Sequence, residues 1–481
     1  MTPAQQQLVD AITARFGPKA VVTDPQAIAP WLEDWRGRYR GTAPAILQPD
    51  STEAAAAMVT LATGLGVPLV PQGGNTSMVG GATPPADGSA LIVSLRRMNR
   101  IRRVDAEAGL IEAEAGVILS DLHDAALAQG RRFPLTLGAK GSATIGGLVS
   151  TNAGGTQVLR FGTMRGLVLG VEAVLPDGSV HDGLAALKKD NRGYDLNQLL
   201  VGAEGTLGLV TAASLKLVPA IAARAVAWAG VESPHVALDL LRMLERATDT
   251  IESFEIVPAH SLDLVLRHIP DTRAPLAGAH PWHVLIESVT TSQDAEAPAA
   301  LIERLLADAF ERGLVRDATV AASEAQAEAM WKLRDSISEA ERASGPALQH
   351  DISVPVAGMP DFMIDGAAAV EARFPGTSAG AFGHLGDGNV HFHVRAPVGS
   401  PADWAVRNAG TISPFVHDLV VAAGGSISAE HGIGQMKRDE LARLASPARL
   451  YALAAIKRAF DPGNLFNPGK LVTLAPERGA Q

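Results

Sequence analysis

Two glycine-rich loops constrain the fold of this chain more than any other feature. The first, residues 71–81, reads PQGGNTSMVGG, and the second, residues 138–155, reads GAKGSATIGGLVSTNAGG. Glycine lets the backbone approach a diphosphate closely, and successive backbone amides can bind an anion without a lysine. Either loop alone is more simply interpreted as a series of turns. Together they predict that one long cofactor is held at two points along the chain.

The first loop follows a pattern that is typical of a strand, a helix and a second strand. Residues 45–49 and 67–71 are expected to be strands, and Asp50 with Glu53 three residues later is expected to begin the helix between them. Neither loop matches the nicotinamide-binding pattern G-x-G-x-x-G with its following acidic residue. The sequence therefore disfavours a Rossmann domain.

Composition excludes several classes of protein. With 481 residues, 47% of them hydrophobic and 19% charged, the chain is expected to be globular with at least two cores. A net charge of -10 disfavours a nucleic-acid partner. The absence of cysteine excludes disulfides and thiolate ligands, so any metal must be bound by His and carboxylates. Residues 1–16 lack a basic flank followed by an apolar core, so a cytoplasmic protein is expected.

Residues 220–425 predict a separate substrate domain. Strand-like and helical segments alternate in it, which predicts an α+β arrangement over a sheet. In the segment MWKLRDSISEAERA, Arg334 and Ser338 are four residues apart, so on one helix both would project from the same face. An Arg on a charged helix is usually solvated, but its forked guanidinium also suits two-point binding of a carboxylate.

The segment HLGDGNVHFH, residues 384–393, brings three histidines close together in the chain. His391 and His393 are two residues apart, so both side chains leave an extended strand by the same face. His384 lies across a glycine-containing turn and can fold back toward them. A metal site and a solvated turn with ordinary histidines are both compatible with this segment alone.

Six segments carry a family resemblance. PQGGNTSMVGG, GSATIGGLVSTNAGG and GYDLNQLLVGAEGTLG resemble the FAD-binding domain of the vanillyl-alcohol oxidase superfamily. GHLGDGNVHFH, SISAEHGIGQMKRD and FDPGNLFNPGKL resemble its branch of D-lactate, glycolate and D-2-hydroxyglutarate dehydrogenases. The resemblance covers nearly the whole chain. It implies an α+β fold with a two-subdomain FAD-binding domain at residues 1–219, a substrate-binding cap domain with an antiparallel sheet at 220–425, and a C-terminal segment, 426–481, that packs back on the FAD site.

The same resemblance implies which residues line the flavin. They are Pro71, Gly73, Gly74, Asn75, Thr76, Gly80, Gly138, Ser142, Thr144, Gly147, Asn152, Gly154, Glu204 and Asn467. Covalent attachment would need a Cys or His near the ring, but the chain has no Cys and residues 71–81 contain no His. The FAD is therefore expected to be bound noncovalently.

A metal centre and a catalytic base are also implied by the resemblance. His384, His391 and Glu430 would bind Zn²⁺ or another divalent metal, and His431 would face the flavin as the base. Two imidazoles and one carboxylate with an open position form a known catalytic zinc set. His393 stands where the hydroxyglutarate enzymes tend to carry Asn. It is left open between a polar contact to the substrate, a fourth ligand and a bystander on the same strand face.

The resemblance assigns substrate contacts as well. Arg334 would hold a substrate carboxylate, and Ser338 has a hydroxyl where the hydroxyglutarate enzymes carry Thr. Gln349 stands where they carry Lys, which weakens the case for a dicarboxylate because a neutral amide makes weaker bonds than a cation. A protonated His350 next to it could compensate for the missing charge.

The implied activity is FAD-dependent, metal-assisted oxidation of a D-2-hydroxy acid to the 2-oxo acid, with D-2-hydroxyglutarate favoured. The metal would activate the 2-hydroxyl, His431 would take its proton, and a hydride would pass to FAD. The chain has no cluster or haem motif, so the electrons would then go to an electron-transfer flavoprotein or a quinone. A D-lactate dehydrogenase or a glycolate-oxidase-type flavin subunit is the alternative, and a zinc hydrolase is a remote one. A homodimer is left open.

Overall fold

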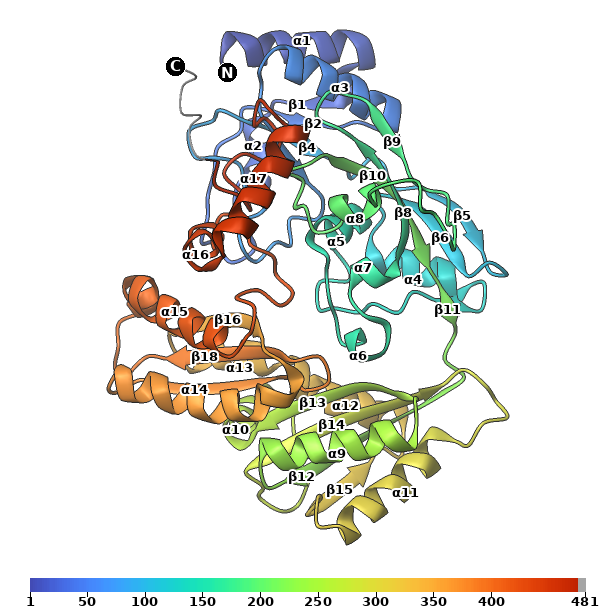
Figure 1. Ribbon diagram of the computed structural model, residues 1–481, viewed down its shortest axis with the longest axis vertical. Helices are drawn as coiled ribbons and strands as arrows, with labels where there is room; N and C mark the ends of the chain where they lie inside the picture. The colour runs from blue at the N-terminus through green and yellow to red at the C-terminus, as the bar shows by residue number, and fades with distance from the viewer. Residues whose placement is uncertain (475–481) are drawn as a thin grey trace. The chain divides into compact units, whose positions relative to one another are not determined.

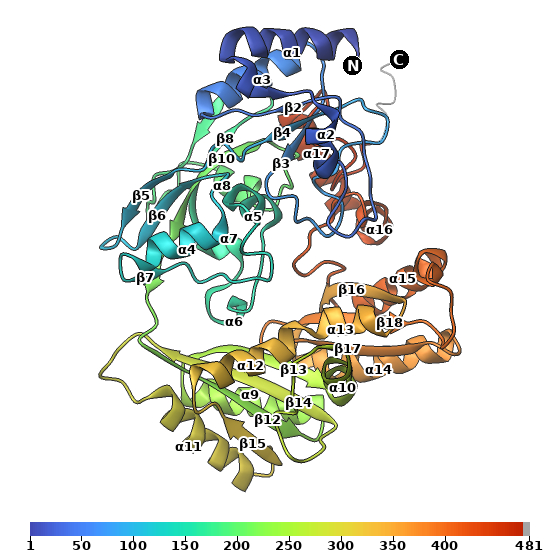
Figure 2. The same cartoon turned by 180° about the vertical axis from the view of Figure 1, so that it is seen from behind.

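The structure is a computed structural model that describes residues 1–474, and the chain divides into two compact units. Unit 1 comprises residues 1–155 and 162–219 together with the chain from 430 onward, and unit 2 comprises residues 156–161 and 220–429. Figures 1 and 2 show the elements of both units from opposite sides. Within residues 1–474, none of the helices combines the length and the apolar character that crossing a bilayer would need.

Within residues 1–474, unit 1 contains helices and three sheets. Its α-helices are α1 (Pro3–Phe16), α2 (Pro25–Ile28), α3 (Thr52–Gly64), α4 (Leu119–Leu127), α5 (Ile145–Thr151), α7 (Met164–Leu167), α8 (Leu196–Leu200), α16 (Arg438–Leu444) and α17 (Pro447–Phe460), and its 3-10 helices are η1 (Pro18–Ala20) and η2 (Ala29–Trp31). Its strands are β1 (Val21–Val22), β2 (Ile46–Leu47), β3 (Leu69–Gln72), β4 (Leu91–Ser94), β5 (Ile101–Asp105), β6 (Leu110–Glu114), β7 (Arg131–Arg132), β8 (Val168–Val174), β9 (Val180–Asp182), β10 (Leu209–Lys216) and β11 (Val218–Pro219).

The first sheet of unit 1 contains the predicted strand, helix and strand. β2, β4 and β3 are parallel with β4 in the middle, and β1 pairs antiparallel with β2. α3 connects β2 to β3 and packs its apolar side, including Met58, against Leu69 in one core. The helix begins one residue later than expected. Ser51, not Asp50, is the N-cap, because its hydroxyl accepts a hydrogen bond from Ala54 N at 3.1 Å.

The second sheet of unit 1 is antiparallel, with the strand order β5-β6-β10-β8-β9. A separate two-stranded pair is formed by β7 and β11. Strand β10 lies in the centre of the larger sheet, and α5 packs against it. The first glycine-rich loop leaves the end of β3, and the second leads into α5. Both loops therefore belong to unit 1.

Unit 2 is built around one large sheet. Its α-helices are α6 (Val158–Phe161), α9 (Pro234–Ala247), α10 (Ala259–His268), α11 (Pro298–Glu311), α12 (Glu324–Asp335), α13 (Ile337–Ser344), α14 (Met359–Arg373) and α15 (Trp404–Ala422), with a 3-10 helix η3 (Val356–Gly358). Its strands are β12 (Ala223–Val231), β13 (Ile251–Pro258), β14 (Trp282–Thr290), β15 (Asp317–Val320), β16 (Ala347–Ser353), β17 (Ser378–His384) and β18 (Asn389–Arg395).

The seven-stranded sheet of unit 2 is antiparallel throughout, in the order β15-β12-β14-β13-β17-β18-β16. Alternate residues of a strand face opposite sides. Ala227 and Ile286 join a core with α9, α11, α14 and α15, whereas Trp228 and Leu285 join a core with α10, α12 and α13. Helices α9, α11 and α14 lie in front of this sheet in Figure 1, and α12 and α13 lie in front of it in Figure 2. A sheet covered on both sides supports its side chains rigidly.

Residues 156–161 leave unit 1 and join unit 2. Ser253 Oγ on β13 donates a hydrogen bond to the Thr156 carbonyl oxygen at 2.9 Å, and Arg160 of α6 pairs with Glu252 at 3.4 Å. Leu159 packs against the larger core of the unit. A four-residue helix that follows the second glycine-rich loop in sequence is thus part of the other unit.

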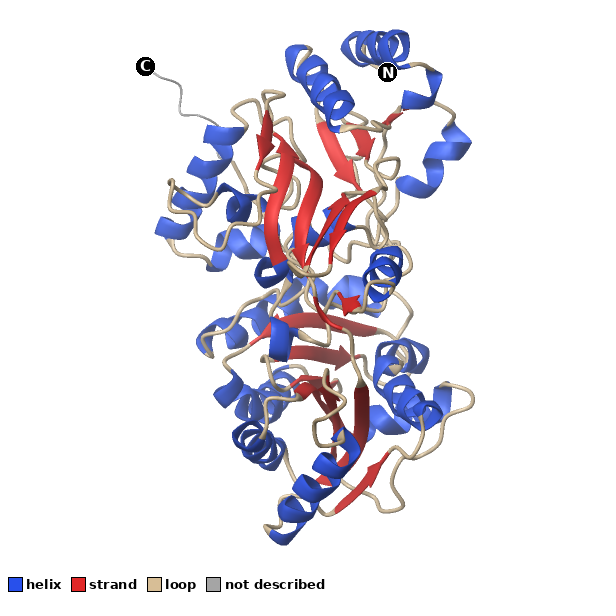
Figure 3. Cartoon of the chain, turned by 90° about the vertical axis from the view of Figure 1, so that its right-hand side faces the viewer, coloured by secondary structure: helices blue, strands red, loops and turns tan. Residues whose placement is uncertain are grey.

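The predicted fold class, α+β with an antiparallel sheet in the second half, is confirmed, and Figure 3 separates its strands from its helices by colour. The single helix expected over Arg334 and Ser338 is wrong. α12 ends at Asp335 and α13 begins at Ile337, with Ser336 between them. The rule for residues four apart on one helix therefore does not place Arg334 and Ser338 on a common face.

Candidate functional site

A hairpin of the large sheet carries the three histidines of segment 384–393. β17 ends at His384, and a tight turn leads into β18. The strand register puts His384 opposite Asn389 and His391 opposite Phe382. Directly opposed residues of an antiparallel pair face the same side, and alternate residues of a strand share a side. His384, His391 and His393 therefore all face the side of the sheet that α12 and α13 cover.

The turn of this hairpin depends on a glycine. Gly388 has a φ of +82°, and a Cβ there would lie 2.2 Å from the Val354 carbonyl oxygen. Any other residue would be both strained and blocked by backbone. The Asp387 carboxylate accepts a hydrogen bond from Asn389 N at 2.9 Å, which closes the turn. The backbone thus fixes where His384 leaves the strand.

A buried carboxylate holds His384 in place. His384 Nδ1 lies 2.6 Å from Oε1 of Glu255, whose side chain is 1% exposed. A carboxylate can only accept a hydrogen bond when ionised, so Nδ1 carries the proton and donates it. The other ring nitrogen, Nε2, then keeps a lone pair. This is the tautomer that a metal-binding imidazole uses when a second group orients it.

The same carboxylate binds Arg334. Arg334 Nε donates to Oε2 of Glu255 at 2.6 Å, and its Nη2 lies 3.3 Å from His384 Nε2. The guanidinium also lies over the Phe382 ring, 5.4 Å from its centroid. Burial raises the pKa of Glu255, but the charge of Arg334 and the hydrogen bonds from His384 and Arg334 outweigh it and hold the pKa below its usual value. Glu255 is therefore ionised, and its carboxylate connects the two predicted site residues, Arg334 and His384, in one hydrogen-bonded cluster.

Glu255 was not identified from the sequence. The signal available was a single acidic residue in the strand-like segment SFEIVP, between residues that are buried on both sides. A charged residue in a buried strand needs a partner, since an unpaired buried charge is costly. Its partners are 79 and 129 residues away in the chain, so no local pattern reveals them.

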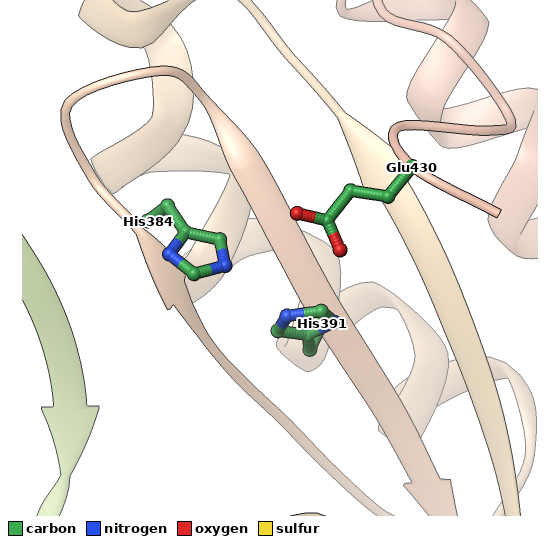
Figure 4. A group of neighbouring side chains, drawn as sticks. All are labelled: His384, His391 and Glu430. Carbon is green, nitrogen blue, oxygen red and sulfur yellow. The ribbon is translucent and has the colours of Figure 1, made fainter. Parts of the chain in front are cut away.

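His384, His391 and Glu430 bring possible metal ligands together. One ligand atom from each side chain lies within 4.8 Å of the others. In Figure 4 the two imidazole rings and the Glu430 carboxylate face a common point. Ser426, which lies four residues before Glu430 in the chain, forms a β-bridge with Ser353 of β16.

The donor set fits a divalent metal. Two imidazoles with one carboxylate are ligands that Zn²⁺ accepts, and His384 has a second group that orients it. A second group of three neighbouring ligand atoms consists of Asp351, Glu430 and His431. Asp351 lies opposite His391 in the strand register and accepts a hydrogen bond from Asn389 Nδ2 at 3.0 Å. Asp351 was not predicted, although it too is a lone acid inside a strand.

His393 lies beside a different carboxylate. Its Nδ1 is 3.8 Å from Oε2 of Glu341, which also accepts a hydrogen bond from Arg395 Nε at 2.6 Å. Burial raises the pKa of Glu341, but the nearby His393 and the hydrogen-bonded Arg395 outweigh it and lower the pKa to about 2. Glu341 therefore carries a negative charge next to His393 at neutral pH. Among the described residues, His393 belongs to neither group of neighbouring ligand atoms.

Gln349 and His350 face opposite sides of the sheet. Gln349 lies opposite His393 in the register of β16 and β18, so the two share a side. His350, the next residue, is buried on the other side, where Nδ1 lies 3.1 Å from the Phe392 carbonyl oxygen and Nε2 lies 3.0 Å from Ser413 Oγ. The expectation that His350 could compensate for Gln349 is wrong, because neighbouring residues of a strand point in opposite directions. Ser338 lies in α13 and is partly buried.

The two glycine-rich loops lie against each other in unit 1. A Cβ on Gly73 would be 2.1 Å from Thr144 Oγ1, and one on Gly74 would be 1.9 Å from the Ser142 carbonyl oxygen. Among residues 1–474, Thr144 Oγ1 and Asn467 Oδ1 are buried and have no hydrogen-bond partner. Buried polar atoms are normally satisfied, so these two atoms fit a bound ligand with polar groups, such as FAD.

Other predicted flavin contacts have structural partners. Asn152 Oδ1 accepts hydrogen bonds from Thr163 Oγ1 at 2.9 Å and from Arg165 N at 2.8 Å. Asn75 Nδ2 donates to the Glu33 carbonyl oxygen at 2.8 Å. These side chains therefore fix the path of the loops. The remaining predicted residues lie in β3 (Pro71), in the first loop (Thr76, Gly80), at the exposed start of the second loop (Gly138), in α5 (Gly147), after it (Gly154), and at the turn before β10 (Glu204).

Comparison with known proteins assigns the chain to a family. Residues 43–183 match the FAD binding domain family, and residues 221–471 match the family of FAD linked oxidases, C-terminal domain. This chain is an FAD linked oxidase by family. A D-2-hydroxyglutarate dehydrogenase of Arabidopsis thaliana is 36% identical over 460 residues, 95% of this chain and 80% of the relative. A protein of Schizosaccharomyces pombe, whose name gives D-lactate dehydrogenase as a provisional activity, is 33% identical over 94% of this chain and 86% of its own.

A solved structure agrees with the family assignment. The structure of p-cresol methylhydroxylase with substrate bound has a TM-score of 0.76 at 15% identity, covering 98% of each chain. At that identity it shows the fold alone. The resemblance to the vanillyl-alcohol oxidase superfamily, and to its D-2-hydroxyglutarate and D-lactate branch, is confirmed.

The expected cytoplasmic location is wrong by this comparison. The relatives from Arabidopsis thaliana and Schizosaccharomyces pombe are both named mitochondrial. The expectation was drawn from the lack of an apolar export segment. Such a segment marks secretion or membrane insertion, and it does not separate the cytosol from the interior of an organelle.

Glu255→Gln tests whether this carboxylate supports the possible metal ligands. We expect the affinity for Zn²⁺, measured by competition with a chromogenic chelator, to fall roughly ten- to hundredfold, because a neutral amide no longer orients His384. The matched control is Glu252→Gln, a buried carboxylate on the same strand that pairs with Arg160. Equal Zn²⁺ affinity in the two variants would contradict the role of Glu255.

Proposed function

We propose that the chain is an FAD-dependent dehydrogenase that oxidises a D-2-hydroxy acid, D-2-hydroxyglutarate foremost, to the 2-oxo acid. The observation that carries the proposal is the hydrogen-bonded cluster of Glu255, Arg334 and His384, which lies beside His391. It places a guanidinium, which suits a carboxylate, next to imidazoles that suit a metal. A 2-hydroxy acid presents a carboxylate and a hydroxyl on adjacent carbons. The activities named for the Arabidopsis thaliana and Schizosaccharomyces pombe relatives support the same reaction class.

The proposed roles divide along the chain. Residues 1–219 and 426–481 hold noncovalent FAD, and residues 220–425 form the substrate-binding cap. His384, His391 and Glu430 hold Zn²⁺ or another divalent metal. Thr144 and Asn467 supply polar contacts to the flavin, which is supported by their buried atoms without a protein partner among residues 1–474. The glycines of the two loops allow close approach of the backbone to the diphosphate.

The chemistry follows from these roles. When bound, FAD supplies the acceptor for the hydride that leaves C2, and the divalent metal supplies a Lewis acid toward the 2-hydroxyl. Arg334 binds the C1 carboxylate and orients the substrate, held in place by Glu255. His431 takes the proton of the 2-hydroxyl as general base. Ser338, Gln349 and His393 contact the remainder of the substrate.

The electrons then leave the chain. With no cysteine in 481 residues, the chain has no ligand for a cysteine-bound iron–sulfur cluster. We propose an external acceptor, either an electron-transfer flavoprotein or a quinone. The acceptor would oxidise the flavin between turnovers, and the substrate half of the reaction can be observed without it.

D-Lactate is the second candidate substrate, because of Gln349. This neutral side chain shares a side of the sheet with His393, and His393 lies beside the negative charge of Glu341. Both features disfavour a second carboxylate at that end of the substrate. A monocarboxylate such as D-lactate has no such group to place there.

Anaerobic bleaching of the flavin tests the proposed activity. The purified protein should be yellow, and D-2-hydroxyglutarate should bleach it faster than D-lactate, glycolate or any L-2-hydroxy acid. The measurement is flavin absorbance in a stopped-flow instrument without oxygen. A colourless protein without releasable flavin, or a yellow one that no 2-hydroxy acid bleaches, would contradict the proposed function.

Metal removal should separate reduction from flavin binding. Chelation should abolish bleaching and leave FAD bound, because the proposed ligands lie apart in sequence from the glycine-rich loops. His384→Ala and Glu430→Gln should behave like the chelated protein. His235→Ala, which changes an exposed histidine on α9, is the control and should keep metal and normal bleaching. A ligand variant with bound metal and near-normal bleaching would exclude the assignment.

Gln349→Lys should shift the substrate preference. A new charge-assisted hydrogen bond contributes about 1.5 to 3 kcal/mol, or roughly ten- to a hundredfold in selectivity for 2-hydroxyglutarate over lactate. Gln349→Met, without charge, is the matched control. Arg334→Ala should weaken both substrates. Bleaching rates that change equally for both acids in Gln349→Lys would show that position 349 does not face the distal end of the substrate.

A further inference from the structure

The segment that carries Glu430 and His431 is fixed by another buried carboxylate. Glu204 lies in the turn between α8 and β10 and is 8% exposed. Its Oε1 accepts a hydrogen bond from Ile433 N at 2.7 Å, and its Oε2 accepts one from Gly434 N at 2.7 Å. Both carboxylate oxygens are thus bound to consecutive backbone amides just after His431. All of these residues belong to unit 1.

Further contacts give this segment little freedom. Gln435 N and Met436 N both donate to the Val79 carbonyl oxygen at 3.2 Å. A Cβ on Gly432 would lie 2.8 Å from Glu204 Oε1, and one on Gly434 would lie 2.3 Å from the Val79 carbonyl oxygen. The segment is therefore held between Glu204 and the first glycine-rich loop, with glycine at both close approaches.

The turn that carries Glu204 is itself held in a costly conformation. Glu204 has a φ of +51°, which a residue with a side chain adopts only when its surroundings enforce it. Asn467 Nδ2 donates to the Glu204 carbonyl oxygen at 2.7 Å and to the Gly81 carbonyl oxygen at 2.9 Å. Burial raises the pKa of Glu204 above its usual value, and the two amide hydrogen bonds and the charges of Lys437 and Lys470 offset this only in part. Strain and a buried carboxylate at one residue indicate a specific task.

We propose that Glu204 is a positioning residue for the catalytic segment. Its two hydrogen bonds fix the backbone of residues 432–434, and through it the place of Glu430 and His431 relative to the first glycine-rich loop. The inference rests on the proposed function for the roles of Glu430 and His431. It assigns Glu204 to the backbone of the C-terminal segment instead of to the flavin.

The first test measures the backbone directly, without substrate. Glu204→Gln keeps one acceptor oxygen and turns an amide N–H₂ toward the other backbone N–H, so one hydrogen bond is lost. Glu204→Asp keeps the charge but shortens the side chain, and it serves where Gln does not fold. In the FAD-loaded protein, hydrogen exchange of peptides within residues 430–437 should become at least about tenfold faster, since exchange reports local opening. Peptides from β10 should not change.

The second test asks whether Glu204 acts through His431. Under anaerobic conditions, Glu204→Gln should lower the flavin reduction rate about ten- to a hundredfold, because displacing a catalytic group by about 1 Å has an effect of this size. FAD content should stay within twofold of the parent. In a His431→Ala background the same change should cost less than about threefold, since the interaction it serves is already gone. Glu172→Gln is the matched control, because that unit 1 carboxylate accepts hydrogen bonds from Thr52, Thr211 and Arg102.

The outcomes separate this inference from the proposed function. Unchanged exchange at 430–437 in both Glu204 variants would overturn the positioning role, and so would loss of FAD or an equal rate loss with and without His431. A parent protein that no 2-hydroxy acid reduces would overturn the proposed function and, with it, the catalytic part of the inference. In that case the exchange measurement still decides whether Glu204 holds the segment. Glu172→Gln should leave exchange at 430–437 and the reduction rate of the folded protein unchanged.

Discussion

The candidate site depends on one interaction, the sharing of the Glu255 carboxylate between Arg334 and His384. Each oxygen has its own partner, at 2.6 Å in both cases. Removing one partner of a buried ion pair typically costs about 3–5 kcal/mol, because it leaves a buried charge without compensation. The orientations of His384, the proposed metal ligand, and of Arg334, the proposed carboxylate-binding residue, therefore depend on each other. A change at either one disturbs the charge that holds the other.

The sheet explains why these side chains meet. β13, β17, β18 and β16 are neighbours in one antiparallel sheet, and their register puts Glu255, His384, His391, His393 and Gln349 on a single side. The opposite side of the same strands is filled by apolar side chains that pack under α14 and α15. Side chains on a strand that is packed on both sides keep their direction more precisely than side chains on a loop. Arg334 comes from α12, which covers this side of the sheet. Glu430 and His431 lie on neither the sheet nor its covering helices, and they need a separate means of placement.

Sequence patterns predicted the parts of this arrangement that have a local signal. Glycine density located the two loops, alternation located the strands of unit 2, and the spacing of His391 and His393 put both on one side. Glu255 and Asp351 were missed because a single acid inside a strand has no periodicity, and its partners are distant in sequence. The break at Ser336 was missed because residues 330–343 are compatible with one continuous helix. His350 was misjudged as a neighbour of Gln349 in space, when strand geometry separates them.

Glu255 and Glu204 are both buried carboxylates that hold parts of the candidate site in place, but they bind different kinds of group. This difference affects which substitutions the chain tolerates. Glu255 binds side chains, so the identity of Arg334 and His384 matters at its two contacts. Glu204 binds backbone amides, which every residue except proline supplies. Ile433 contacts Glu204 through its backbone N–H, so its side chain takes no part in this contact. Gly432 and Gly434, by contrast, have no room for a Cβ. The glycines on either side of Ile433 are then explained by the backbone path that Glu204 requires.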